Sequence, residues 1–233
     1  MKKPSSGTSQ QLPFDLPVEP SASRDDLIES PANSTAIAMV DAWPNWPGSL
    51  AVLAGPVGSG KSHISSIWIE EAGGKSCPLE NLPERIDELQ VCVENGGNLL
   101  LEDAIPGKLD ETALFHILNF IRQFNQFCLI TSRTWPLEWN VQLPDLASRL
   151  RAAQVVELHE PDDLLLKQVM VKLFADRQLM VDEKIIDYCA LRMERSLETA
   201  AKLVAEVDAE AMARKSPISR TIVAQVLEQM GMG

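Results

Sequence analysis

Short apolar runs alternate with longer helical patterns over the first two thirds of the chain. The runs cover residues 49–54, 98–101, 127–131 and 155–158, and a weaker one lies at 75–77. Runs of this length are typical of buried strands. Strands that alternate with helices build parallel sheets through right-handed crossovers, and helices then cover both faces. The pattern therefore predicts an α/β fold with a parallel sheet flanked by helices.

The pattern changes after Pro161, where the strand signal stops. Four helical patterns follow, over residues 162–176, 182–192, 196–213 and 219–230. Asp162, Asp182 and Ser219 stand where N-cap residues are expected. We therefore predict an α/β domain over residues 25–161 and a small all-helical domain over 162–233.

Residues 1–24 are rich in Ser, Pro, Gln and Gly, with one short apolar cluster around Phe14. A segment of this composition buries too little surface to offset the entropy of ordering it. We expect a flexible tail. No apolar segment typical of a secretory signal follows its first two lysines, so we expect a cytoplasmic protein.

Charge and cysteine content narrow the classes of function. The chain has 21 Lys and Arg against 33 Asp and Glu, a formal net charge of −12. This sign opposes DNA binding, which depends on neutralising phosphates. No apolar run approaches the length of a membrane span. The four cysteines are scattered without metal-ligand spacing, which favours reduced thiols.

One segment fits the pattern G-x-x-x-x-G-K-[ST] of phosphate-binding loops. It follows the first strong apolar run and consists of Gly55, Pro56, Val57, Gly58, Ser59, Gly60, Lys61 and Ser62. Gly58 and Gly60 would let backbone N–H groups curl around phosphate oxygens at the start of the helix that continues through His63. Lys61 would reach the β and γ phosphates, and Ser62 would bind Mg²⁺. The cofactor predicted for this site is ADP or ATP with Mg²⁺.

Two acidic residues, Glu102 and Asp103, directly follow the apolar run at 98–101. In nucleotide hydrolases of this type one residue holds the Mg²⁺ shell and another orients the attacking water. Two assignments stay open. Either Glu102 and Asp103 fill both places, or Asp103 holds the metal and Ala104 stands where the second acid would be. Ser62 and Asp103 are the predicted metal residues.

Four further segments, residues 26–33, 129–133, 143–150 and 192–198, complete a wider pattern. With the phosphate loop they resemble the AAA+ family, in the version found in the bacterial replication initiator DnaA. The resemblance implies an AAA+ P-loop NTPase fold whose helical domain is a lid. It makes Arg149 an arginine finger that acts on the nucleotide of a neighbouring subunit. It also makes Arg195 a nucleotide sensor, with Arg192 as the alternative, and places Arg133 near sensor 1.

The tail and the end of the chain refine the resemblance. Gln11, Leu12, Phe14 and Leu16 are similar to the peptide by which proteins bind the sliding clamp, the beta subunit of DNA polymerase III. The sequence ends at Gly233, shortly after the predicted lid, so we expect no DNA-binding domain downstream. In both features the chain resembles DnaA-related regulators. When bound to the clamp, these regulators promote hydrolysis of the ATP bound to DnaA and so prevent over-initiation of chromosome replication.

The resemblance implies the clamp and DnaA as partners and no membrane partner. It is also compatible with a homo-oligomer. Intrinsic ATPase activity would be weak or absent, and either ADP or ATP could be the working ligand. The alternative is a self-turning AAA+ ATPase that remodels or loads a replication factor. Trp43 and Trp46 precede the first strand, where the adenine would lie, and a packing role is the alternative for both.

Overall fold

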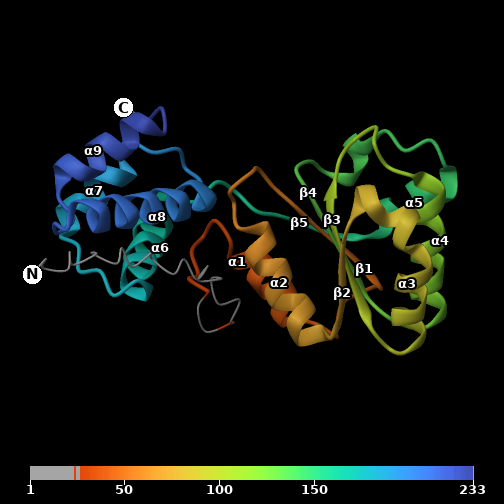
Figure 1. Cartoon of the computed structure of the whole chain (residues 1–233). Coiled ribbons are helices and arrows are strands. Elements are labelled where there is room, and N and C mark those ends of the chain that lie inside the picture. The colour runs from red at the N-terminus through yellow and green to blue at the C-terminus, as the bar shows by residue number, and fades with distance from the viewer. Residues whose placement is uncertain (1–23, 25–26, 233) are drawn as a thin grey trace, which may run out of the picture.

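A computed structural model describes residue 24 and residues 27–232 of the chain. Its sheet has five parallel strands in the order β2-β3-β4-β1-β5 (Figure 1). The strands are β1 (Leu50–Ala54), β2 (Gly74–Pro78), β3 (Asn98–Ala104), β4 (Cys128–Ser132) and β5 (Gln154–Glu157). The prediction of a parallel sheet is therefore confirmed, including the weak strand near residue 75.

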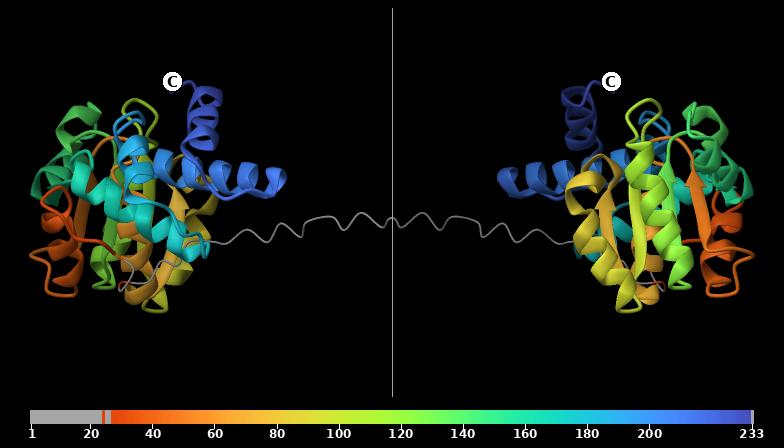
Figure 2. Two further views of the ribbon diagram at one scale, coloured as in Figure 1. Left: turned by 90° about the vertical axis from the view of Figure 1, so that its left-hand side faces the viewer. Right: turned by 90° about the vertical axis from the view of Figure 1, so that its right-hand side faces the viewer.

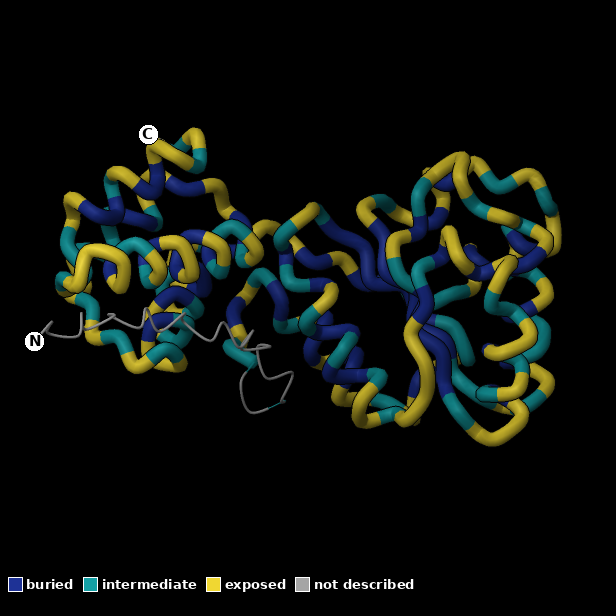
Figure 3. Tube along the Cα trace, viewed as in Figure 1, coloured by how far each residue is buried: buried dark blue, intermediate teal, exposed yellow. Residues whose placement is uncertain are grey.

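Helices cover both faces of this sheet, because alternate residues of its central strands point to opposite sides. The helices of this part are α1 (Ser34–Asp41), α2 (Lys61–Ala72), α3 (Leu82–Glu94), α4 (Glu111–Gln123) and α5 (Pro144–Ala152). Leu99 and Leu101 pack toward α3, α4 and α5, whereas Leu100 packs toward α1 and α2. Figure 3 shows the strands as a buried centre between more exposed helices.

Four helices follow the sheet and form a separate apolar core. They are α6 (Asp163–Asp176), α7 (Glu183–Ala190), α8 (Leu197–Arg214) and α9 (Arg220–Gln229). The three predicted N-caps are confirmed, because Asp162, Asp182 and Ser219 each accept a hydrogen bond from a backbone N–H of the first helical turn. These helices lie at one end of the molecule in Figure 1, and α8 and α9 project beyond the α/β part in Figure 2.

The chemistry-bearing loops gather at the carboxyl ends of the strands, as expected for an open parallel sheet. The phosphate loop follows β1, and Glu102 and Asp103 lie at the end of β3. All four cysteines are free thiols. Across the described residues, no helix is both long enough and apolar enough to span a membrane.

Candidate functional site

The loop between β1 and α2 has the backbone geometry of a phosphate cradle. Gly58 and Gly60 have φ values of 75° and 98°, in the left-handed region that glycine tolerates. Gly60 is the N-cap residue of α2, so the loop ends at the positive end of the helix dipole. The Ser59 hydroxyl is buried without a hydrogen-bond partner among the described residues. This geometry fits the phosphates that the sequence predicts.

Lys61 points back into the loop. Its ammonium donates hydrogen bonds to the carbonyl oxygens of Gly55 at 2.8 Å and Pro56 at 2.6 Å. Burial lowers the pKa of the Lys61 ammonium from its ordinary value, and Arg133 acts in the same direction while Asp103 opposes both. An anion in the cradle would favour the charged form. Lys61 is therefore positioned for phosphates.

The lid makes direct contact with the phosphate loop. The backbone N–H of Leu197, the first residue of α8, donates to the carbonyl oxygen of Gly58 at 2.8 Å. A side chain at position 58 would collide with Ser196, the N-cap residue of α8. Ser196 is 8% exposed, so this contact is sealed from solvent. Glycine is therefore required at position 58 both by its backbone angle and by the close approach of Ser196 from the lid.

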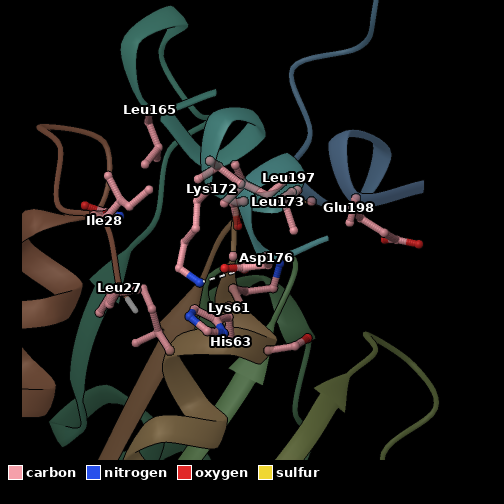
Figure 4. Close-up of a pocket in the computed structure, with 18 residues that line it drawn as sticks. Leu27, Ile28, Lys61, His63, Leu165, Lys172, Leu173, Asp176, Leu197 and Glu198 are labelled. Carbon is pink, nitrogen blue, oxygen red and sulfur yellow. Dashed lines mark hydrogen bonds and ion pairs between the residues drawn. The ribbon is translucent and has the colours of Figure 1, made fainter. Parts of the chain in front are cut away.

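A cavity of about 370 Å³ opens between the phosphate loop and the lid (Figure 4). Loop residues Gly58, Ser59, Gly60, Lys61, Ser62 and His63 line its polar end. Ile28, which precedes α1, lies near Leu165 of α6, and Leu27 and Leu173 add further apolar lining. Such a mixture suits a nucleotide, with its phosphates on the loop and its base among apolar side chains. Gly55 and Val57 belong to the loop but do not line the cavity.

Both acidic residues lie within a bulge of β3. The register with β4 shifts between Leu101 and Ala104, and Asp103 has a φ of 56° with its N–H bonded to the Thr131 hydroxyl at 3.1 Å. Asp103 acts electrostatically on Lys61, whereas Glu102 acts on Cys77. Burial, and then the nearby Asp103, raises the pKa of Glu102 above its ordinary value. Of the two acids, Asp103 is thus the one that acts electrostatically on the lysine of the phosphate loop.

The donor set for a metal consists of single oxygens rather than a preformed cluster. Ser62 is exposed in the first turn of α2, and Asp103 is exposed at the end of β3. Hydroxyl and carboxylate oxygens suit Mg²⁺, which keeps several waters and shares substrate phosphates. No group of three or more His, Cys, Asp or Glu able to hold a metal occurs within the described part of the chain. The residues therefore fit a Mg²⁺ ion bound together with a nucleotide.

A hydrogen-bond network at Ser132 joins the ends of the central strands. The Ser132 hydroxyl donates to the carbonyl of Ala104 and accepts from the indole N–H of Trp139. Its own carbonyl accepts from the N–H of Gly55. This network fixes the phosphate loop relative to the bulge in β3. Arg133, the next residue, is exposed and lies within electrostatic reach of Lys61.

Arg149 lies on α5, away from the cavity, and does not line it. Its guanidinium bonds to the side-chain oxygen of Asn119 and lies 5.0 Å from the ring centroid of Phe115, both on α4. Helices α4 and α5 cover the face of the sheet opposite to α1 and α2 (Figure 1). The arginine is half-buried, and its contacts are with α4 and not with the cavity of its own chain.

Two arginines of the lid lie outside the cavity lining. Arg195 forms an ion pair with Asp163 at 2.8 Å, and both side chains are more than half exposed. The Arg192 guanidinium lies 3.9 Å from the ring centroid of Tyr188. Arg195 directly precedes Ser196, which contacts the phosphate loop. The sensor role of Arg195 stays a prediction, and its side chain would have to leave Asp163 to reach a nucleotide.

The two tryptophans before β1 have a packing role, which the sequence analysis gave as the alternative to contact with the adenine. Trp46 is 7% exposed and stacks on Trp68, with ring centroids 5.3 Å apart, while its indole N–H donates to the carbonyl of Met39. Trp43 packs edge-on against Phe127. Neither lines the cavity. The apolar wall comes instead from Leu27, Ile28 and α6, which the sequence analysis missed.

No family model matches the sequence. Among curated proteins, the chromosomal replication initiator protein DnaA of Flavobacterium psychrophilum is 21% identical over 228 residues, covering 88% of this chain and 48% of that protein. The chain thus spans about half the length of this relative. Among solved structures, domain III of DnaA from Thermotoga maritima has a TM-score of 0.78 at 19% identity, covering 92% of this chain and 98% of that one.

The chain has the AAA+ fold of DnaA domain III. Other solved structures are also similar to this chain. AMPPCP-bound DnaA from Aquifex aeolicus has a TM-score of 0.68 at 20% identity, over 84% of this chain and 67% of that one. The RuvB Holliday junction branch migration motor of Thermotoga maritima has a TM-score of 0.70 at 18% identity, over 89% and 72%. The prediction of an AAA+ P-loop fold is therefore confirmed.

Proposed function

We propose that this chain is a nucleotide-binding regulator of the Hda type, which promotes hydrolysis of the ATP bound to DnaA. It would act on the sliding clamp and so prevent over-initiation of replication. The similarity to DnaA in sequence and fold supports the choice of partner. We further propose residues 25–161 as the α/β domain and 162–233 as the lid.

The bound ligand in this proposal is ADP or ATP with Mg²⁺. The glycine cradle, the charge of Lys61 and the buried Ser59 hydroxyl support phosphate binding. Ser62 and Asp103 would share the metal with phosphate oxygens, which neutralises charge on the phosphates. The cavity beside Leu27 and Leu165 would take the base.

The position of Arg149 is the observation that carries the proposal. Its guanidinium is held by α4 on the face of the sheet away from its own cavity. This position supports a role at the nucleotide site of another subunit and not at its own. There its planar fork would stabilise charge that develops on the transferred phosphoryl group. Among the described residues, no arginine lines the chain's own cavity, which supports weak intrinsic hydrolysis.

Residues 1–24 provide the proposed tether to the clamp. Gln11, Leu12, Phe14 and Leu16 lie outside the described residues, so this step rests on the sequence pattern. A short peptide with apolar anchors can bind a groove of its partner without help from the folded domain. Tethering raises the effective concentration of Arg149 near a DnaA molecule on the same DNA.

A reconstituted reaction tests this proposal. DnaA from the same organism is loaded with labelled ATP and mixed with this protein, the clamp and DNA, with each component omitted in turn. Hydrolysis of the DnaA-bound ATP is expected to accelerate only when the clamp is loaded and this protein is present. Rapid hydrolysis by this protein alone, with no effect on DnaA, would instead favour the self-turning ATPase, which its complete phosphate loop would permit.

A further inference from the structure

One stripe of α4 faces the helix that carries Arg149. Glu111, Phe115 and Asn119 are spaced four residues apart, so they occupy successive turns of one helix face. Phe115 and Asn119 hold the Arg149 side chain. Glu111, at the start of the same stripe, contacts the opposite end of α5.

The Glu111 carboxylate receives backbone hydrogen bonds from the residues that lead into α5. The N–H of Gln142 donates to both carboxylate oxygens, at 2.9 and 3.0 Å, and the N–H of Leu143 donates to one of them at 2.7 Å. Bonds from N–H groups to an ionised carboxylate are among the stronger hydrogen bonds of proteins. Glu111 therefore fixes the backbone at the point where α5 begins.

Helix α5 has no cap of its own at this end. Its N-cap residue is Leu143, whose apolar side chain cannot accept a hydrogen bond. The first N–H groups of a helix need partners from outside, and a negative charge there is favoured by the helix dipole. Helix α4 does not need Glu111 for the same purpose, because the Asp110 side chain accepts from the N–H of Ala113 at 2.8 Å. Glu111 is thus available to cap the neighbouring helix.

We propose that Glu111 is a positioning residue for Arg149, an inference that rests on the proposed function. With Glu111 at its start and Asn119 near its end, the nine-residue α5 is attached to α4 at both ends. Loss of the first attachment would let α5 shift relative to the sheet, and the guanidinium would shift with it. Small displacements of this kind are costly for a group that must meet a transition state in a neighbouring subunit.

The test uses Glu111→Ala and Glu111→Gln in the full chain, with Asp145→Asn as the matched control. Asp145 is an acidic residue in the first turn of the same helix, and no hydrogen bond or ion pair from its side chain is found among the described residues. Its removal changes the charge at this helix end but leaves the Glu111 bonds intact. The readouts are single-turnover hydrolysis of DnaA-bound ATP at increasing concentrations of this protein, ADP affinity, and amide hydrogen exchange over residues 142–152.

The Glu111→Ala variant should lower the limiting rate roughly 10- to 100-fold, with the half-saturating concentration and the ADP affinity near their wild-type values. Glu111→Gln, which keeps one acceptor oxygen, should fall between it and the wild type, and Asp145→Asn should match the wild type. Exchange over residues 142–152 should accelerate in Glu111→Ala. If Glu111→Ala does not fold, the limiting rate of Glu111→Gln decides the matter.

Two results would overturn the inference alone: a wild-type limiting rate in Glu111→Ala, or a raised half-saturating concentration with an unchanged limiting rate. The second result would assign Glu111 to docking instead of positioning. A wild-type protein that does not accelerate hydrolysis at all would contradict the proposed function itself.

Discussion

Lys61 is 9% exposed, and its charge is balanced by two loop carbonyls rather than by a direct ion pair. Both bonds stay within the phosphate loop, so we expect the core to tolerate replacement of this side chain. Burial lowers the pKa of this ammonium, which means that the folded protein stabilises the charge less than water does. A bound phosphate would reverse that imbalance.

We therefore expect Lys61→Ala to keep the fold and lose nucleotide binding. The affinity for ADP should fall by roughly two orders of magnitude, since hydrogen bonds to charged groups contribute about 1.5–3 kcal/mol each. Isothermal calorimetry measures the affinity, and Lys108→Ala, at an exposed lysine outside the cavity, is the control. Unchanged ADP binding in Lys61→Ala would show that the loop is not the phosphate site.

Individual residues were predictable from the sequence where a motif fixes the spacing. The phosphate loop is of this kind, because the glycines and Lys61 act through backbone geometry that the pattern itself specifies. The position of Asp103 was not predictable, because it depends on a bulge and on the bond that its N–H donates to the hydroxyl of Thr131, 28 residues away. The partners of Arg149 were equally hidden, since they lie on another helix.

Among the elements, four of the five strands were predicted from clear apolar runs, whereas the edge strand β2 gave only a weak one. The first three residues of β2 are exposed and include Gly74 and Lys75, so its apolar run is short. Helix α3 was not predicted, because charged residues interrupt its few buried apolar positions. Burial by tertiary packing, rather than local pattern, decides such segments.

The start of α8 permits a sharp test of the contact between lid and phosphate loop. Leu197→Pro removes the N–H that donates to Gly58, while proline is well tolerated at the first position of a helix. The preceding Ser196 already has an extended backbone, with φ −141° and ψ 127°, which a following proline favours. The helix should therefore persist without its bond to the loop.

We expect ADP to dissociate several-fold faster from Leu197→Pro than from Leu197→Ala, because a typical hydrogen bond contributes about 0.5–1.5 kcal/mol. Both variants lose the leucine side chain, so their difference isolates the backbone bond. Stopped-flow release of a fluorescent ADP analogue gives the rates, and circular dichroism checks the helix content. Equal rates in the two variants would mean that this bond does not hold the lid over the nucleotide.

On the scale of the whole molecule, the cavity proposed for the nucleotide lies between the phosphate loop and the lid, and the contact of α5 with α4 holds Arg149 away from it. The order of elements along the chain was sufficient to predict this fold, because strands alternating with helices allow few topologies. The role proposed for Arg149 could be inferred only from a family resemblance, since nothing in its local sequence distinguishes it from a surface arginine. The structure adds the contacts that hold it.

The proposed tether gives a prediction for the complete chain. Replacing Gln11 and Leu12 by alanine should abolish clamp binding and leave the melting temperature unchanged, because such a peptide acts by short anchors in its partner's groove and contributes nothing to the core. A pull-down with the clamp and a melting curve measure the two effects, with Ser5 and Ser6 replaced by alanine as the control. Retained clamp binding, or a melting temperature several degrees lower, would count against a separate tether.

The central claim is that Arg149 acts on the nucleotide of a neighbouring DnaA subunit. Single-turnover hydrolysis of DnaA-bound ATP, with the clamp loaded on DNA, tests it most directly by comparing the wild type with Arg149→Ala and Arg149→Lys. We predict normal binding of ADP and clamp by both variants, with acceleration reduced by about 10³–10⁵-fold or to the basal rate. Lysine should rescue little, because its ammonium lacks the planar fork. Full acceleration by Arg149→Ala would contradict the account.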